Sequence, residues 1–246
     1  MAGSVLTPVL ARAGRLVRGL IEAAFPLACA ACGSGLAGDD DKDGWPLCAT
    51  CRGGLVDCGP PFCLACARAQ ASPLSCARRD HRRLRAGFTW NEPLRAVVHA
   101  FKFGDVPELA GPLVAAAWAR PGFAAHPRPD LVVPVPLHPL RRRERGYDQA
   151  AGLAREFGAR AGVPVVDVLE RRRATRQQAR LSAAARRVNV EGAFVVVAPA
   201  LVRGRRVALV DDVVTTGATI EAAASALVPA GPRTVELWGV AHEPLE

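Results

Sequence analysis

Two adjacent carboxylates, Asp211 and Asp212, follow a short apolar stretch in the segment ALVDDVVTTGAT (residues 208–219). Small residues, several with hydroxyl groups, come next and lead into a helix expected from about Gly217. Such a loop lets successive backbone N–H groups turn toward one point, and the helix N-terminus adds partial positive charge, so the loop suits a phosphate. The carboxylates repel phosphate, but they suit ribose hydroxyls or a divalent cation. The segment is therefore typical of a site for a phosphorylated sugar.

The phosphate would be held by the loop itself, with hydroxyl donors from its three threonines. The loop residues are Val214, Thr215, Thr216, Gly217, Ala218 and Thr219. An ordinary strand, turn and helix with a conventional N-cap is the simpler alternative, but it does not explain two like charges at the end of a buried strand. A dinucleotide-binding fold needs G-x-G-x-x-G after its first strand, and neither that pattern nor a P-loop occurs here.

All eight cysteines lie between residues 29 and 76. Cys29-x2-Cys32 and Cys48-x2-Cys51 have the spacing of a four-thiolate zinc ribbon. Disulfides are the alternative, but the sequence has no export signal, and the cytosol keeps thiols reduced. We therefore expect a closed, structural zinc site.

A second zinc site is expected from Cys63, Cys66 and Cys76. Its fourth ligand stays open between Cys58 and His81, because the position that would close a second CxxC pair is an arginine.

Alternating apolar strands and helices run through the rest of the chain. Strands are expected at residues 86–90, 130–137, 163–169, 206–212 and 234–241, and helices at 91–103, 107–119, 147–162 and from about 217 to 228. This order predicts an α/β fold with a parallel sheet covered by helices on both faces. We expect an N-terminal amphipathic helix over residues 1–28, a cysteine-rich zinc domain over 29–85 and the α/β domain over 86–246.

The net charge of +9 is concentrated in one part of the chain, because residues 141–206 hold 16 arginines and only six acidic residues. This excess indicates an anionic partner, either phosphates on a small molecule or a nucleic acid backbone. No run approaches the roughly 20 apolar residues of a membrane span. Arginines also interrupt the N-terminal apolar stretch, which argues against a secretory signal. A cytoplasmic protein is expected.

The strand, acid pair and TTGAT loop resemble the phosphoribosyl-pyrophosphate (PRPP) motif of type I phosphoribosyltransferases. Three other segments and the cysteines resemble the ComF (GntX-like) family in the same order: HAFKFGD (99–105), LVVPVPLHPLRRRERGYDQA (131–150) and RATRQQARLSAAARRVNVEGAF (173–194). The family usually has Phe-Asn where this chain has Tyr147 and Asp148. The resemblance covers roughly residues 25–242 and implies a type I phosphoribosyltransferase fold behind a zinc-binding segment.

The resemblance also implies roles for individual residues. Asp211, Asp212 and Arg145 would be catalytic, with Mg²⁺ as cofactor. Val135 and Pro136 would face the pyrophosphate, with a cis peptide as one way to shape that loop. Lys102 would either join them or be a solvated side chain. A lid that excludes water would use Arg173, Gln178, Arg186 and Asn189.

Two functions follow from these residues. The first is Mg²⁺-dependent transfer of 5-phosphoribosyl from PRPP to an unknown acceptor. The alternative is a zinc-containing accessory protein that handles single-stranded DNA and keeps the PRPP pocket without turnover. The family's link to natural competence makes a competence-machinery partner an expectation as well.

Overall fold

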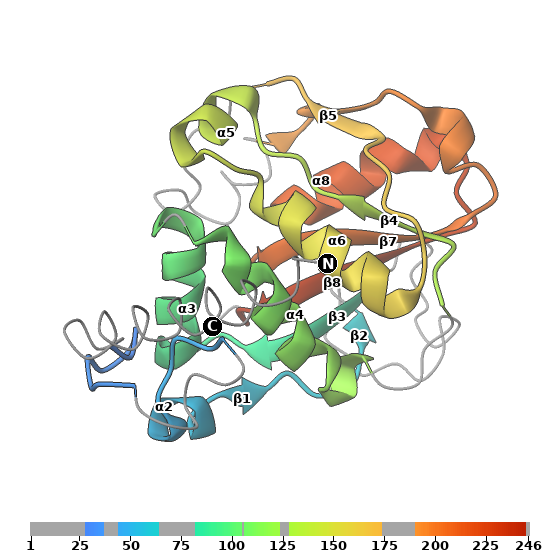
Figure 1. Cartoon of the computed structure of the whole chain (residues 1–246). Coiled ribbons are helices and arrows are strands. Elements are labelled where there is room, and N and C mark those ends of the chain that lie inside the picture. Colours follow the sequence, from blue (N-terminus) through green and yellow to red (C-terminus); the bar gives the residue numbers. More distant parts are fainter. Residues whose placement is uncertain are drawn as a thin grey trace, which may run out of the picture.

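A six-stranded sheet forms the centre of the molecule (Figure 1). The computed structural model describes residues 28–36, 44–63, 82–104, 106–123, 128–173 and 190–244. Strands run in the order β1-β3-β8-β7-β4, and β2 also pairs with β3. Their bounds are β1 Val56–Asp57, β2 Phe62–Cys63, β3 Arg83–Thr89, β4 Leu131–Pro134, β7 Arg206–Val214 and β8 Thr234–His242. The central four strands are parallel, whereas β1 and β2 join β3 in antiparallel pairs.

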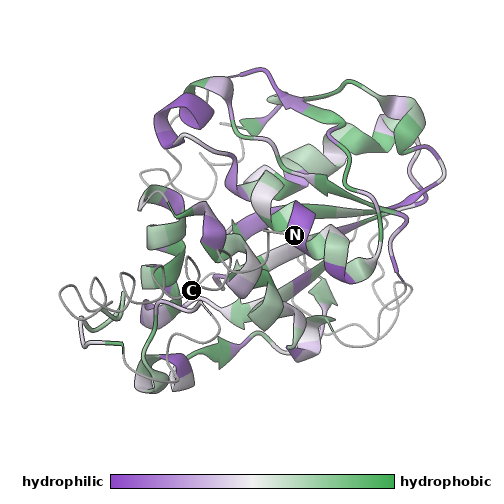
Figure 2. Cartoon of the chain, in the orientation of Figure 1, coloured by the Kyte–Doolittle hydropathy of each residue, from purple (hydrophilic) through white to green (hydrophobic). Residues whose placement is uncertain are grey.

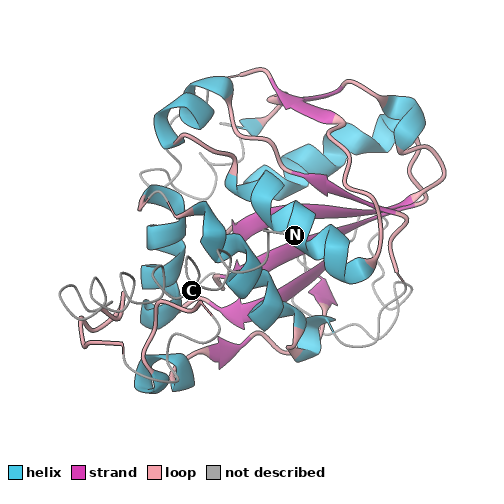
Figure 3. Ribbon diagram, in the orientation of Figure 1, coloured by secondary structure: helices cyan, strands magenta, loops and turns pink. Residues whose placement is uncertain are grey.

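Helices cover both faces of this sheet (Figure 3). One face packs against α3 (Glu92–Phe103), α4 (Ala110–Trp118) and α6 (Gln149–Ala161). The other packs against α8 (Ala218–Leu227) and a small separate sheet of β5 (Leu169–Arg171) and β6 (Phe194–Val196). The shorter elements are α2 Ala49–Gly53, α5 Pro139–Arg145 and 3-10 turns at Pro107–Leu109, Pro121–Phe123, Pro199–Leu201 and Val228–Ala230.

The strand sequences explain the two faces. In β7, Ala208 and Val210 pack under α4 and α6, whereas Val207 and Leu209 pack under α8. Side chains of a strand alternate between faces, so a continuous apolar run fills two cores at once. Figure 2 shows the contrast with α5, whose residues are strongly hydrophilic.

The cysteine-rich segment shares the core of the α/β part. Trp45 and Leu47 are buried in the same cluster as Phe88 of β3, and the rings of Trp45 and Phe88 meet edge to face at 6.4 Å. Strands β1 and β2 also extend the main sheet through β3. β3 itself begins at Arg83, so the predicted domain boundary between residues 85 and 86 falls within this strand.

The predicted α/β class with mostly parallel strands is confirmed, but one strand is wrong. Residues 163–169 make only a single parallel bridge, between Val165 and Val132, and the chain becomes a strand again at Leu169, outside the main sheet. Pro164 has no N–H to donate, which stops the ladder on the N-terminal side of Val165. On the other side the chain turns toward β6, and the carbonyl of Val168 accepts from Val197. Residues 1–27, which hold almost all of the predicted N-terminal helix, lie outside the described residues. Within the described part of the chain, no helix is long and apolar enough to cross a membrane.

Candidate functional site

Asp211 and Asp212 lie on β7 beyond the point where the neighbouring strand β4 ends. β4 pairs with β7 only as far as Pro134, which lies opposite Val210. β7 continues beside β8 to Val214, because β8 supplies partners up to His242. The sequence had indicated that the two carboxylates end the strand. In the structure they lie within it, because β7 continues for two more residues, to Val214. They still lie toward the carboxyl ends of parallel strands, where α/β sheets bind ligands.

The two carboxylates have different neighbours, as expected for successive residues of a strand. Oδ1 of Asp212 lies 3.0 Å from Nζ of Lys102 on α3. Each carboxylate also accepts a hydrogen bond from the next backbone N–H: Asp212 donates to Asp211 at 2.9 Å, and Val213 donates to Asp212 at 2.6 Å. Lys102 is thus held at the acid pair rather than extended into solvent.

The electrostatics of Asp211 set it apart from an ordinary surface acid. Desolvation by burial, and after it the charge of Asp212, raise the pKa of Asp211 from 3.8 to about 7. The charges of Lys102 and Arg171 and the backbone N–H of Asp212 act in the opposite direction. A carboxyl with a strongly raised pKa in such a position is typical of functional sites.

Arg171 is a site residue that the sequence did not single out. It lies at the end of β5, and its guanidinium lies over the ring of Phe194 at 5.4 Å. Burial lowers the pKa of Arg171, Asp211 acts to raise it, and Arg141 of α5 lowers it further. Lys102 and Arg171 therefore bring positive charge to the acid pair from two separate elements, and Arg141 acts on Arg171.

The predicted phosphate loop begins α8. Gly217 has φ of 74°, a left-handed conformation that favours glycine, and it is the N-cap of the helix. The N–H of Ala218 donates to Oγ1 of Thr216 at 3.3 Å, so this amide already has a partner within the loop. Gly217 and Ala218 are buried, whereas Thr215, Thr216 and Thr219 are half-buried. The threonines are the more accessible part of the loop.

The loop after β4 is fixed by hydrogen bonds at both ends. The N–H of buried Val135 donates to the carbonyl of Val210 at 2.8 Å. The N–H of Leu137 donates to Oδ2 of Asp148 at 3.3 Å, and the same carboxylate caps α6 by accepting from Ala151. Pro136 between them is half-buried. The described residues include no cis peptide, so the cis bond considered for this loop is not present.

Arg145 packs against the end of α3. Its guanidinium lies 4.9 Å from the centre of the Phe103 ring and donates to Oε1 of Gln149 at 3.0 Å. The ring of Tyr147 lies 5.9 Å from that of Phe101 at the same junction. Two segments that are distant in sequence, HAFKFGD and RRRERGYDQA, thus meet beside Lys102. Arg145 itself contacts Phe103 and Gln149 rather than the acid pair.

Of the predicted lid residues, Arg173 is exposed, and Gln178, Arg186 and Asn189 lie outside the described residues.

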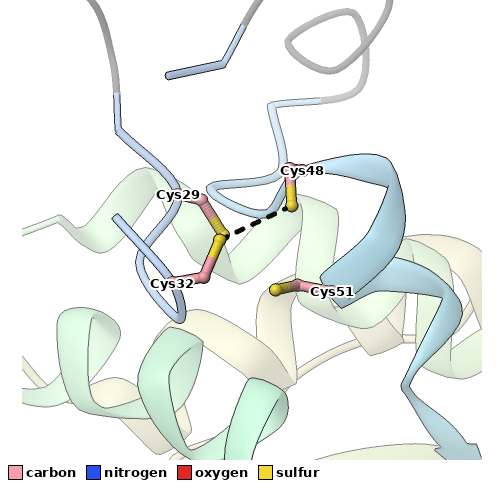
Figure 4. Close-up of side chains that lie close together, drawn as sticks. All are labelled: Cys29, Cys32, Cys48 and Cys51. Atoms are coloured by element: carbon pink, nitrogen blue, oxygen red, sulfur yellow. Dashed lines mark hydrogen bonds between the residues drawn. The ribbon is translucent and has the colours of Figure 1, made fainter. Parts of the chain in front are cut away.

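Four cysteines form a compact cluster (Figure 4). Cys29 and Cys32 lie in a loop, whereas Cys48 is the N-cap of α2 and Cys51 lies within that helix. The Sγ atoms of Cys29, Cys32, Cys48 and Cys51 all lie within 4.8 Å of one another. Burial opposes ionisation of Cys29, but hydrogen bonds from the backbone of Cys48, Cys32 and Ala31 outweigh it and lower its pKa to about 6. A thiolate favoured in this way suits a metal ligand. The cluster could therefore hold a metal such as zinc, as the spacing predicted.

The predicted second zinc site stays a prediction. Cys63 is buried on β2 and Cys58 is half-buried, and burial raises the pKa of the Cys58 thiol to about 11. The other proposed ligands, Cys66, Cys76 and His81, lie outside the described residues.

Comparisons with known proteins match this architecture. Residues 143–244 match the model of the phosphoribosyl transferase domain. Competence protein F of Haemophilus influenzae is 34% identical over 158 residues, which cover 61% of this chain and 69% of that protein. DNA utilization protein YhgH of Salmonella typhi is 31% identical over 209 residues, which cover 79% of this chain and 89% of that protein.

Among solved structures, glutamine PRPP amidotransferase from B. subtilis, complexed with ADP and GMP, is similar with a TM-score of 0.35 and 19% identity. The match covers 67% of this chain and 29% of that enzyme. The relatives' identity and coverage confirm the resemblance inferred from the sequence motifs: the chain belongs to the family of competence protein F (ComF) and DNA utilization protein YhgH, and it contains a phosphoribosyl transferase domain.

Proposed function

We propose that the chain binds PRPP together with Mg²⁺ and transfers the 5-phosphoribosyl group to an acceptor. The observation that carries this proposal is the acid pair beside the threonine loop, with Lys102 and Arg171 acting on its two carboxylates. The loop at residues 215–219 would take the 5-phosphate at the start of α8, chiefly through the hydroxyls of its three half-buried threonines. The carboxylates would take the ribose hydroxyls.

The residues present fit a magnesium ion at the acid pair. Oδ1 of each carboxylate accepts a backbone hydrogen bond, and that of Asp212 also meets Lys102. Oδ2 of each carboxylate has no hydrogen bond or ion pair with any residue that the structure describes, so it could accept from a ribose hydroxyl or bind a hard cation, which prefers oxygen ligands. When bound, Mg²⁺ would neutralise charge on the pyrophosphate.

In the proposed reaction the bond between C1 of the ribose and the pyrophosphate oxygen breaks, and the pyrophosphate leaves with the electron pair. A lone pair of the acceptor then forms the new bond to C1. The chain's part is to hold the two ends of PRPP and to place positive charge near the leaving group, which lowers the barrier electrostatically. Arg141, Arg145 and Arg171 are the candidates for that charge. Arg173, Gln178, Arg186 and Asn189 would close over the site and exclude water.

Thermal unfolding with and without PRPP and Mg²⁺ tests the binding step. A ligand at 100 times its dissociation constant should stabilise the fold by about 2.7 kcal/mol. The shift in melting temperature should disappear in the Asp211→Asn, Asp212→Asn double variant. It should persist in Asp167→Asn, which removes an exposed acid outside the acid pair. An equal shift in the double variant would contradict the proposal. Release of pyrophosphate in a screen of bases, amines and nucleic acids would then identify an acceptor.

A second candidate is an accessory function with single-stranded DNA in the cytoplasm, in which the PRPP pocket is kept without turnover. The names of the relatives, competence protein and DNA utilization protein, favour it. Arg142 and Arg143 on α5 are exposed and available to phosphates. Binding to an oligonucleotide should weaken by about 0.7 log unit per phosphate contact for each log unit of salt. Oligonucleotide binding that does not depend on salt would exclude this candidate. A partner from the competence machinery would be sought separately, by co-purification.

A further inference from the structure

A cavity of about 510 Å³ lies away from the acid pair, between α2, α4 and the end of α6. Three arginines from different segments line it: Arg52, Arg120 and Arg160. Its apolar wall is formed by Trp45, Leu55 and Pro112, together with alanines of α4. The volume falls in the range of small-molecule sites, which is about 300 to 1,000 Å³. None of the lining residues belongs to β7, α5 or α8, so the cavity is distinct from the proposed PRPP site.

Each of these arginines stands at or just after the last turn of a helix. Arg52 is in the last turn of α2, Arg160 is in the last turn of α6, and Arg120 follows α4. Cations at helix C-termini are common, because they interact favourably with the helix dipole. That role alone would not require three of them to converge on one cavity.

Arg120 is held in a fixed position at the cavity. Its guanidinium lies 4.9 Å from the centre of the Phe88 ring, and its NH1 lies 3.2 Å from Oδ1 of Asp57. Its Nε is buried and makes no hydrogen bond with any described residue. A guanidinium that is already held in place binds an anion with less ordering cost than a free side chain does.

Arg160 brings positive charge to the rim of the cavity. Arg160 is exposed and forms no ion pair within the described ranges. One acid, Glu156, lies at the edge: its carboxylate would be 3.8 Å from a Cβ added at Gly111. Asp57 pairs with Arg120, and neither Asp57 nor Glu156 forms an ion pair with Arg160 in the described part of the chain, so the guanidinium of Arg160 is open to an anionic ligand.

We propose that this cavity is a second ligand site, which takes the phosphate of a nucleotide-like ligand. The guanidinium fork of arginine matches phosphate oxygens in pairs, which a lone ammonium does not. The apolar wall of Trp45, Leu55 and Pro112 would take the flat or hydrocarbon part of the ligand. The same chemistry is offered by a free nucleotide and by one unit of a single strand, and the two sources are separated by experiment.

Fluorine NMR of protein labelled with 5-fluorotryptophan tests the site directly. The chain has four tryptophans, and only Trp45 lines the cavity, so a Trp45→Phe variant identifies its resonance. ADP and a short oligothymidylate are the two probes, and inorganic phosphate is the reference anion. We expect one of the probes to move the Trp45 resonance to saturation, and which one does so tells a free nucleotide from a strand.

Matched variants decide whether the arginines carry the binding. Loss of charge-assisted hydrogen bonds in Arg52→Gln, Arg160→Gln should weaken binding roughly tenfold or more. Arg155→Gln, on the exposed side of the same helix α6, should bind as the wild type does, and so should Asp211→Asn. If the double variant folds poorly, Arg160→Gln alone serves, because its side chain is exposed. A Trp45 resonance that does not move, an unchanged dissociation constant in the arginine variants, or equal affinity for inorganic phosphate would each overturn the proposal. A loss of binding confined to Asp211→Asn would overturn it as well, because the probes would then occupy the PRPP site.

Discussion

Lys102 and Asp212 form an ion pair that joins the end of α3 to β7, with 3.0 Å between Nζ and Oδ1. The side chains of both are mostly buried, with 23% and 13% exposed. Two neighbouring carboxylates repel each other, so a cation on one side of the pair offsets part of that cost. The pair also holds the end of α3, where Phe103 contacts Arg145, close to the site.

Replacing Lys102 by methionine should raise the pKa of Asp211 above its value of about 7. The reason is that the charge of Lys102 acts to lower that pKa, although it does not touch Asp211 directly. The pKa can be followed from the carboxyl carbon of Asp211 by NMR over a pH titration. Arg142→Met removes an exposed charge of α5 and should leave the pKa unchanged. An unaltered or lower pKa in Lys102→Met would contradict this assignment.

Asp211 should make the native state less stable as the pH rises. Its pKa is about 7 in the folded protein and near the ordinary value of 3.8 in the unfolded chain. The folded state therefore keeps the proton over a range where the unfolded chain has lost it, and stability falls between about pH 4 and pH 7. Asp211→Asn removes this loss and should be more stable by roughly 1 to 3 kcal/mol at pH 8, with allowance for partial exposure.

Urea denaturation at pH 8 and pH 5 measures this effect. The gain in unfolding free energy of Asp211→Asn should be smaller at pH 5, because the carboxyl of Asp211 in the folded wild type is then largely protonated. Asp167→Asn, an exposed acid, should show no difference between the two conditions. A less stable Asp211→Asn at pH 8 would mean that the carboxylate is stabilising in the fold, against the direction of its pKa.

The sequence predicted the central strands because each is an apolar run long enough to fill two faces of a sheet. β4, β7 and β8 all have this character, and their parallel order followed from the helices between them. Residues 163–169 are also mostly apolar, but they include the exposed Asp167 and Pro164, which has no N–H to donate. Hydropathy registers neither a lost hydrogen-bond donor nor the pairing of Val168 with Val197 near β6, so this prediction failed for reasons of backbone hydrogen bonding.

The sequence predicted the part of the site that is contiguous in the chain, but not the part that is brought in by long-range pairing. The acid pair and the threonine loop are contiguous, so their proximity is a property of the sequence itself. Arg171 has two arginines directly after it, and the family motif begins only at the third of them, Arg173. Its selection depends on the pairing of β5 with β6, which places it against Phe194 and near Asp211. Such long-range placement is not readable from residue type or spacing.

Metal removal should destabilise part of the main core as well as the cysteine cluster itself. Cys29 is buried in the same cluster as Trp45 and Leu47, so loss of a bound zinc would disturb part of the main core. Cys48→Ser, or a strong chelator, should lower the melting temperature by roughly 5 °C or more. Thr50→Ala, an exposed position between Cys48 and Cys51, is the control and should keep both its metal content and its melting temperature. A metal-free wild-type protein with an unchanged melting temperature would contradict a structural zinc.

Glu236 should be essential for stability without any contact with the proposed site. Its Oε2 lies 2.8 Å from Nε of Arg85 and accepts from Nε1 of Trp238 at 3.0 Å. Arg85 is fully buried, and its NH1 donates to the carbonyl of Gly122 at 2.9 Å. Glu236→Gln leaves the buried guanidinium without its counter-charge, so it should cost roughly 3 kcal/mol of unfolding free energy.

A surface pair provides the matched comparison for Glu236. Glu170 and Arg172 are 3.3 Å apart, but their side chains are 55% and 63% exposed. Glu170→Gln should therefore cost less than about 0.5 kcal/mol in the same urea titration. PRPP should still stabilise Glu236→Gln by the same increment as the wild type, because neither Arg85 nor Glu236 contacts the acid pair. Equal denaturation midpoints for the two glutamine variants would show that the buried pair contributes no more than a solvent-screened one.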